Sequence, residues 1–325
     1  MSVTETVVQP AVARDFFRPR RLGHTNLFVG DYLAAKDFYH KVAGFNEGYR
    51  QPDNLASFLS NGNSYHDLTL VDVKSHYNHD HCGPGMNHIA FELETEVDLA
   101  DGWRRAQAAG IDFRCADHDV AHSLYTNDPD GNGVEFYADV VRDQREARKG
   151  IIIKQKPEYI PGVSSPPIAE RFYPQDPKID VVEGATFHSR RCSHVLLLTD
   201  RYEDMFAYYR DIGGLKPFWR DDRAGIAVFA GTHSVGDVTL QRRRAGQATG
   251  MHHFGLEVQD EADLVAGRAK AAAAGLQIVR EIDHPARHAV CIKDPDGLII
   301  QFYANRDFRP ERLNGLNEDT ALYLL

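Results

Sequence analysis

Cysteine is scarce in this sequence, and long apolar runs are absent. Only four cysteines are scattered over 325 residues, a usage that suits a reducing cytoplasm better than a disulfide framework. No stretch approaches the roughly 20 apolar residues that a membrane-spanning helix needs, and residues 1–20 contain no apolar signal core. We therefore expect a cytoplasmic protein without a membrane partner.

Positive charge is also in deficit. The chain carries 37 Lys and Arg against 47 Asp and Glu, which gives a formal net charge of −10. This balance argues against nucleic acid as a main partner, although it leaves an anionic small substrate possible. The hydrophobic content of 42% is ordinary for a globular protein, and the length allows two domains.

One phrase occurs twice with one informative change. The first Asp-Pro-Asp-Gly leads to Val-Glu135-Phe-Tyr, whereas the second leads to Ile-Gln301-Phe-Tyr. Apolar runs that open with His24 and His194 repeat in the same register, 170 positions apart, and Glu135 and Gln301 are 166 apart. A repeat of this length indicates duplicated domains, because solenoid repeats are much shorter.

Each half contains two similar units. In the first unit, a strand at His24–Val29 leads into an amphipathic helix that ends at Gly44, and alternating strands follow. A strand at His88–Leu93 and a helix at Val97–Ala109 begin the second unit in the same way. The pattern predicts an α+β fold of four tandem βαβββ modules that form two domains with concave mixed sheets.

A proline-rich stretch separates the halves. Six prolines between residues 142 and 189 are poorly suited to helix interiors or sheet centres, which indicates a linker. The expected division is an N-terminal segment (1–19), a catalytic domain (20–141), the linker (142–189), a degenerate domain (190–305) and a C-terminal tail (306–325).

Three residues of the first half form a candidate metal-binding set. His24 and His88 each begin the first strand of a unit, and Glu135 lies on the last strand of the second unit. If the two units pair side by side, these strands converge in one concave sheet. Two imidazoles and one carboxylate form the ligand set of Fe(II) sites with open positions, which Mn(II) also accepts.

The phrases around these residues resemble a known family. They are Gly-His24-Thr-Asn26, Tyr-His66-Asp-Leu-Thr-Leu, Asn-His88-Ile-Ala-Phe and His118 followed by Ser-Leu-Tyr125. The first half resembles a catalytic domain of the type I extradiol ring-cleaving dioxygenases, within the vicinal-oxygen-chelate superfamily. The motifs are closest in style to the homoprotocatechuate 2,3-dioxygenase branch. The resemblance implies two vicinal-oxygen-chelate domains, a catechol-type substrate, O2 as co-substrate and assembly into a homo-oligomer.

The resemblance also implies roles for individual residues. His24, His88 and Glu135 would bind iron, and His66 would be the acid/base that takes a catechol proton. A histidine suits this task, because its pKa lies near neutrality. Further implied roles are a substrate-facing Tyr125, a hydrogen-bonding His118 and an Asn26 near bound oxygen. His122 competes with His118 for contact with the substrate, and Arg114 either pairs with an anionic substrate group or is a solvated charge.

The second half departs from this pattern. Gln301 replaces the carboxylate, Gly236 stands where His66 would repeat, and Cys291 stands where Tyr125 would repeat. A neutral amide is a weak ligand for a hard cation, so we expect this half to be structural. Most two-domain members of the family carry iron in the C-terminal domain, whereas the intact set here is N-terminal.

Two other functions fit the same fold. A glyoxalase-like isomerase or lyase would need a fuller ligand set, to which Asp67 could contribute a second carboxylate. A non-enzymatic binding protein would need a pocket but no metal triad. Because His66 accompanies the complete triad, the sequence favours an extradiol catechol dioxygenase over both alternatives.

Overall fold

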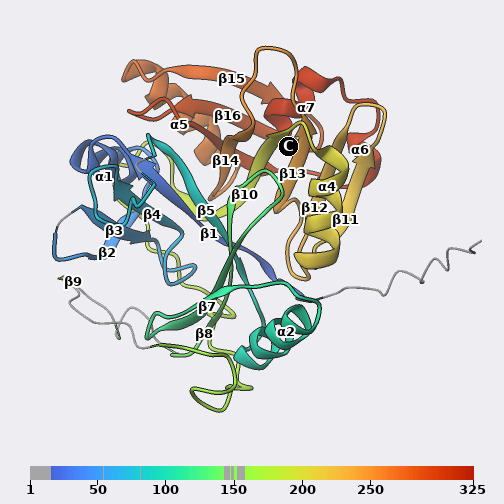
Figure 1. Cartoon of the computed structure of the whole chain (residues 1–325). Helices are drawn as coiled ribbons and strands as arrows, with labels where there is room; N and C mark the ends of the chain where they lie inside the picture. Colours follow the sequence, from blue (N-terminus) through green and yellow to red (C-terminus); the bar gives the residue numbers. More distant parts are fainter. Residues whose placement is uncertain (1–15, 54, 81, 143–146, 148–149, 152–157) are drawn as a thin grey trace, which may run out of the picture.

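The computed structural model describes residues 16–53, 55–80, 82–142, 147, 150–151 and 158–325. Two curled sheets of mixed strand direction lie against each other, one from each half of the chain (Figure 1). The first sheet has the strand order β6-β7-β8-β5-β1-β4-β3-β2-β9, and the second has the order β11-β12-β13-β10-β14-β17-β16-β15. Within the described residues, no helix is long and apolar enough to cross a membrane.

The predicted α+β plan of four βαβββ modules is confirmed. The first half consists of β1 (Arg21–Val29), α1 (Tyr32–Lys41), β2 (Asn46–Arg50), β3 (Ala56–Ser60), β4 (Leu68–Asp72), β5 (Gly85–Glu92), α2 (Glu96–Ala108), β6 (Arg114–Asp117), β7 (Ala121–Asn127), β8 (Gly133–Asp139) and the edge strand β9 (Gly150–Ile151). The second half consists of β10 (Ser189–Thr199), α4 (Tyr202–Ala207), the π-helical turn η1 (Tyr208–Ile212), β11 (Lys216–Asp221), β12 (Ile226–Ala230), β13 (Val238–Arg242), β14 (Gly250–Val258), α5 (Glu261–Ala273), β15 (Ile278–Asp283), β16 (Arg287–Lys293), β17 (Ile299–Asn305), α6 (Pro310–Leu313) and α7 (Glu318–Leu324).

Local sequence explains where the helices begin and end. The side chain of Asp31 accepts the Ala34 N–H at the start of α1, and Thr95 accepts the Asp98 N–H at the start of α2. Such caps satisfy backbone donors that a helix leaves open at its first turn. Gly44 follows α1 with a φ of 79°, a left-handed conformation that glycine adopts without a steric penalty.

Modules pair side by side within each half. Strand β1 runs antiparallel to β5, and β5 runs parallel to β8. Asn26 is opposite His88 in the first pair, and Ala90 is opposite Glu135 in the second. This arrangement brings the first strand of each module and the last strand of the second module onto one concave face.

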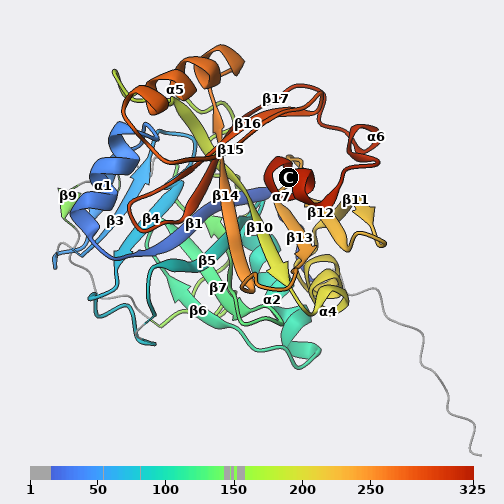
Figure 2. The same cartoon turned by 90° about the horizontal axis from the view of Figure 1, so that it is seen from above.

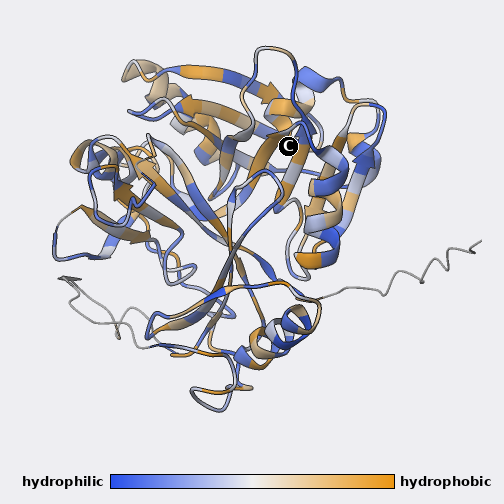
Figure 3. Ribbon diagram, in the orientation of Figure 1, coloured by the Kyte–Doolittle hydropathy of each residue, from blue (hydrophilic) through white to orange (hydrophobic). Residues whose placement is uncertain are grey.

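Hydrophobic residues extend along the strands of both sheets (Figure 3). The core also includes aromatic residues from outside the predicted domain limits. Phe17 stacks on Phe136 with 4.2 Å between ring centroids, and Phe187 stacks on Phe302 at 4.0 Å. Phe17 and Phe187 hold equivalent places, 170 positions apart. The structural repeat therefore begins before residues 20 and 190, inside the predicted N-terminal segment and linker.

Reciprocal hydrogen bonds join the two halves. The side chain of Asp67 accepts the N–H of Cys192 on β10, and the side chain of Asp237 accepts the N–H of Leu22 on β1. Two tyrosines also form reciprocal hydrogen bonds between the halves. Tyr39 of the first half donates to Asp294, and Tyr209 of the second half donates to Asp128, each at 2.9 Å.

The C-terminal tail folds back onto the second sheet. Helix α7 packs against β15 and β16, within the curve of that sheet (Figure 2). Leu322 and Leu324 on this helix are buried. The tail is therefore part of the second domain in space.

Candidate metal centre

Three side chains converge on the concave face of the first sheet. His24 comes from β1, His88 from β5 and Glu135 from β8. One carboxylate oxygen, Glu135 Oε2, lies 3.1 Å from His24 Nε2 and 3.0 Å from His88 Nε2. The three potential ligand atoms lie within 4.8 Å of one another, and among the described residues no other His, Cys, Asp or Glu side chains form such a group of three. The spacing suits donors that surround one ion.

The electrostatics of the set fit a divalent cation. Burial alone would raise the pKa of Glu135, but hydrogen bonds and charge interactions with His24 and His88 hold it well below its usual range. Burial lowers the pKa of His88, which favours the neutral imidazole that binds metals. Two imidazoles and one carboxylate on one side of a site are the donor set of metals with open coordination positions.

His66 stands beside this set, just before β4. Its ring centroid lies 4.0 Å from that of His24. Burial, followed by the charges of His24 and His88, holds the pKa of His66 well below its ordinary value. Its Nδ1 is buried and has no hydrogen-bond partner among the described atoms. The lowered pKa makes His66 a weaker base than an exposed histidine, but its unpartnered nitrogen is free to accept a hydrogen bond or a proton from a bound molecule.

Tyr125 and His118 complete one side of the site. Tyr125 pairs with Glu135 across β7 and β8, and its hydroxyl lies 2.8 Å from His118 Nε2. Burial and the carboxylate of Glu135 raise the pKa of Tyr125 well above its usual value, so its hydroxyl stays protonated. The guanidinium of Arg114 lies 4.1 Å above the Tyr125 ring.

Asn26 lies on the face of the sheet that carries the metal centre, whereas His122 lies on the opposite face. Asn26 follows His24 by two positions on β1 and therefore faces the same side of the sheet. Its Oδ1 is buried and has no partner within the described part of the chain. His122 lies three positions from Tyr125 on β7, on the opposite face, where Nδ1 is 2.6 Å from Glu96 Oε1. The structure thus places His122 away from the metal centre, because alternate residues of a strand face opposite sides.

An aromatic wall beside His66 was not predicted from the sequence. The wall consists of Tyr49, Phe58 and Tyr65. Tyr49 stacks on Phe58 with 4.0 Å between centroids, and Phe58 and Tyr65 lie 5.2 and 5.0 Å from the His66 ring. Phe58 lies in a strand that the alternation pattern indicates, but the pattern does not say which strand faces the site.

The corresponding place in the second half contains no carboxylate. Gln301 Nε2 lies 3.3 Å from His253 Nε2, and Gln301 Oε1 accepts a hydrogen bond from Arg287 at 3.0 Å. The guanidinium of Arg287 also donates to the carbonyl of Leu324 on α7. A Cβ added at Gly255 would lie 1.9 Å from the His194 ring, whereas the first half has Ala90 at this place. A fixed cation and the C-terminal helix therefore occupy the region where the first half has its triad.

Comparisons with known proteins agree with this fold. The model of the "Glyoxalase/Bleomycin resistance protein/Dioxygenase superfamily" matches residues 21–136 and 191–302. Catechol-2,3-dioxygenase of Bacillus subtilis is 25% identical over 296 residues, which cover 86% of this chain and 96% of that protein. A variant of homoprotocatechuate 2,3-dioxygenase from Brevibacterium fuscum has a TM-score of 0.64 at 18% identity, over 93% of this chain and 75% of that one. The Mn(II)-bound glyoxalase from Novosphingobium aromaticivorans has a TM-score of 0.63 at 16% identity, over 90% and 85%.

Proposed function

This chain belongs to the glyoxalase/bleomycin resistance protein/dioxygenase superfamily, and on that premise we propose that it is an extradiol catechol dioxygenase. The observation that carries the proposal is the grouping of His66 and Tyr125 around one intact triad on a concave face. The Bacillus subtilis relative, 96% of which is covered by the match, carries the name catechol-2,3-dioxygenase.

His24, His88 and Glu135 would hold Fe(II), and Mn(II) accepts the same donors. When bound, the metal would act as a Lewis acid and as a template that holds the vicinal hydroxyls of the substrate near O2. The carboxylate of Glu135 supplies the negative charge of the ligand set, which an amide cannot supply.

His66 acts as the proton acceptor in this proposal. A catechol that enters the site must lose a hydroxyl proton, and the neutral imidazole of His66 is positioned beside the triad to take it. The same nitrogen can return the proton later in the reaction. The aromatic wall next to His66 supplies flat apolar surface for packing against the substrate ring.

Tyr125 contributes a hydrogen-bond donor at the opposite side of the triad. Its ring centroid lies 5.5 Å from that of His88, and its hydroxyl is held by His118. Because its pKa is raised, the phenol retains its proton and can stabilise negative charge that develops on an oxygen of the substrate. His118 positions this hydroxyl rather than contacting the metal set.

An isomerase of the glyoxalase type is the alternative that the Mn(II)-bound fold neighbour raises. It would need a further carboxylate, for which Asp67 was the sequence candidate. The Asp67 side chain instead accepts the Cys192 N–H and a hydrogen bond from Asn63. Since this carboxylate is directed at the second half, its arrangement favours the dioxygenase.

The deciding experiment is oxygen uptake by protein purified without oxygen, loaded with Fe(II) or Mn(II), and supplied with a panel of catechols. Stoichiometric uptake with a yellow ring-opened product is the expected result. Turnover of a glyoxalase-type substrate under strict anaerobiosis, with no uptake for any catechol, would contradict the proposal. Light scattering and fractionation would test the accompanying predictions of a homo-oligomer and a cytoplasmic location.

A further inference from the structure

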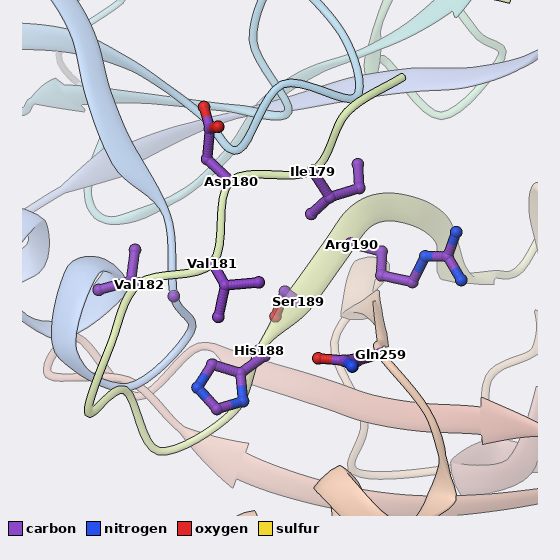
Figure 4. Close-up of a pocket in the computed structure, with 9 residues that line it drawn as sticks. Ile179, Asp180, Val181, Val182, His188, Ser189, Arg190 and Gln259 are labelled. Carbon is purple, nitrogen blue, oxygen red and sulfur yellow. The ribbon is translucent and has the colours of Figure 1, made fainter. Parts of the chain in front are cut away.

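A cavity of about 230 Å³ lies outside the metal centre, where β10 enters the second sheet (Figure 4). Aliphatic side chains of Ile179, Val181 and Val182 form one part of its wall, and Ser189, Arg190 and Gln259 form another. A cavity of roughly 150 Å³ is sufficient to bind benzene, so this space admits a single aromatic ring.

The equivalent place in the first half is already occupied. Arg21 pairs with Glu92 at 2.9 Å, and Arg191 pairs with Glu257 at 2.6 Å in the same positions of the second sheet. The residues beside these pairs therefore correspond as well: Arg20 corresponds to Arg190, and Glu94 to Gln259. Both Arg190 and Gln259 line the cavity.

A tyrosine fills the first of these two equivalent places. The Tyr173 ring lies 3.3 Å from the guanidinium carbon of Arg20, and its hydroxyl donates to Glu94 at 2.7 Å. Tyr173 is only 6% exposed, so the phenol is enclosed by the protein. The first half thus shows how a phenol fits between an arginine and an acceptor at this position of the fold.

In the second half, no described residue packs on Arg190 and donates to Gln259 as Tyr173 packs on Arg20 and donates to Glu94. Arg190 is exposed and has no ion pair, hydrogen bond or ring contact with any described residue. Ser189 is 2% exposed, and its Oγ has no hydrogen-bond partner in the same part of the structure. Because that oxygen is itself enclosed, the polar group of this lining that a ligand can reach is the exposed side chain of Gln259.

We propose that this cavity is a second binding site that takes a small uncharged phenol, in the place that Tyr173 takes in the first half. The side-chain oxygen of Gln259 accepts a hydrogen bond from the phenol hydroxyl, just as the Glu94 carboxylate accepts one from Tyr173. The phenol ring packs against Val181 and Val182. The Arg190 side chain extends away from Val181 in Figure 4, so Gln259 and the valines, rather than a stacked guanidinium, hold the phenol in this proposal.

The test uses 4-fluorophenol, followed by its ¹⁹F signal, with the metal-free protein. This probe has one hydroxyl and cannot chelate a metal through two oxygens. We expect saturable binding that weakens about tenfold in Gln259→Leu, which removes the acceptor, and that is abolished in Val181→Trp, which fills the cavity. The matched control is Tyr173→Phe, which alters the equivalent place and should leave the affinity unchanged.

Three results would overturn the proposal. They are the absence of saturable binding to the wild-type chain, affinity that is unchanged in both Gln259→Leu and Val181→Trp, and affinity that Phe58→Ala alone abolishes. The last result would place the probe in the catalytic pocket. Circular dichroism checks that each variant folds. If Val181→Trp does not fold, the affinity of Gln259→Leu decides whether the cavity binds the phenol. The measurement involves no turnover, so its outcome is independent of the proposed dioxygenase activity.

Discussion

The two halves of the molecule have one backbone plan and two different centres. In the first half, Glu135 is placed against two imidazoles on a concave face. At the same place in the second half, Gln301 binds Arg287 and the carbonyl of Tyr323 on α7. The bonds that join the halves are nevertheless present in both directions. The comparison teaches that the interface is duplicated with the fold, whereas the set of two histidines and one carboxylate is present in the first half and not at the equivalent place of the second.

The largest expected effect comes from making the first centre resemble the second. Glu135→Gln removes the only carboxylate of the triad, so we expect loss of the bound metal and a fall in turnover of at least about a hundredfold. Metal analysis and oxygen uptake measure the two effects. Gln301→Glu is the matched control, and it should neither reduce turnover nor create a second metal site, because Arg287 pairs with the new carboxylate. Full metal content in Glu135→Gln would refute the assignment of the triad.

Loss of the proton acceptor should have the next largest effect. We expect His66→Asn to lower kcat by about a hundredfold or more while the metal stays bound, since general acid–base catalysis typically contributes that much. His122→Asn changes a histidine on the opposite face of the same domain and should retain most of the turnover. Steady-state kinetics with metal analysis separates the two variants. Equal losses in both would show that the face of the sheet does not matter.

Arg287 should be important for stability and not for chemistry. Its guanidinium is fully buried and bonds to Gln301, Asn305 and the end of α7. We expect Arg287→Ala to reduce the free energy of unfolding by about 2–4 kcal/mol, because several buried acceptors lose their donor. Urea unfolding measures this loss, and the metal content of the first centre should not change. A fully stable variant would show that the guanidinium does not hold the tail.

The smallest predicted effect concerns the interface carboxylate Asp67. Burial raises the pKa of Asp67 from 3.8, its usual value, to about 7. The folded chain therefore keeps a proton that the unfolded chain releases near pH 4, so this contribution to stability is present at acid pH and is lost as the pH rises through 7. We expect the wild type to gain stability from pH 8 to pH 5 relative to Asp67→Asn, as urea unfolding midpoints at both pH values would show.

Asp237→Asn is the matched control for Asp67→Asn. The Asp237 carboxylate accepts a hydrogen bond across the interface as Asp67 does, but the residue before Asp237 is Gly236, whereas the residue before Asp67 is His66. We expect only Asp67→Asn to lower turnover, because it loosens the peptide that carries His66. Equal turnover in the two variants would mean that the interface does not position His66.

Much of this comparison could be predicted from the sequence, because it rests on local patterns and on a repeat. The register of the repeat identified the modules and the three triad residues, which the strand pairings bring together. His122 lies three positions from Tyr125, so its opposite orientation follows from strand alternation once both residues are known to share β7, and the sequence pattern predicted that strand only from Ser123. The contacts of Arg287 with α7 and of Tyr173 with Arg20 join segments far apart in sequence. No periodicity or composition identifies such contacts.

The arrangement around Arg287 also sets how far the second half is from holding a metal. Building a metal centre there would take more than the single change of Gln301 to a carboxylate. Arg287 would have to leave, α7 would have to withdraw from Gln301, and the ring of His194 would have to move from its place against Gly255. No one of these steps is useful without the others. A second metal centre therefore lies several coordinated substitutions away from this chain, and no single change at Gln301 reaches it.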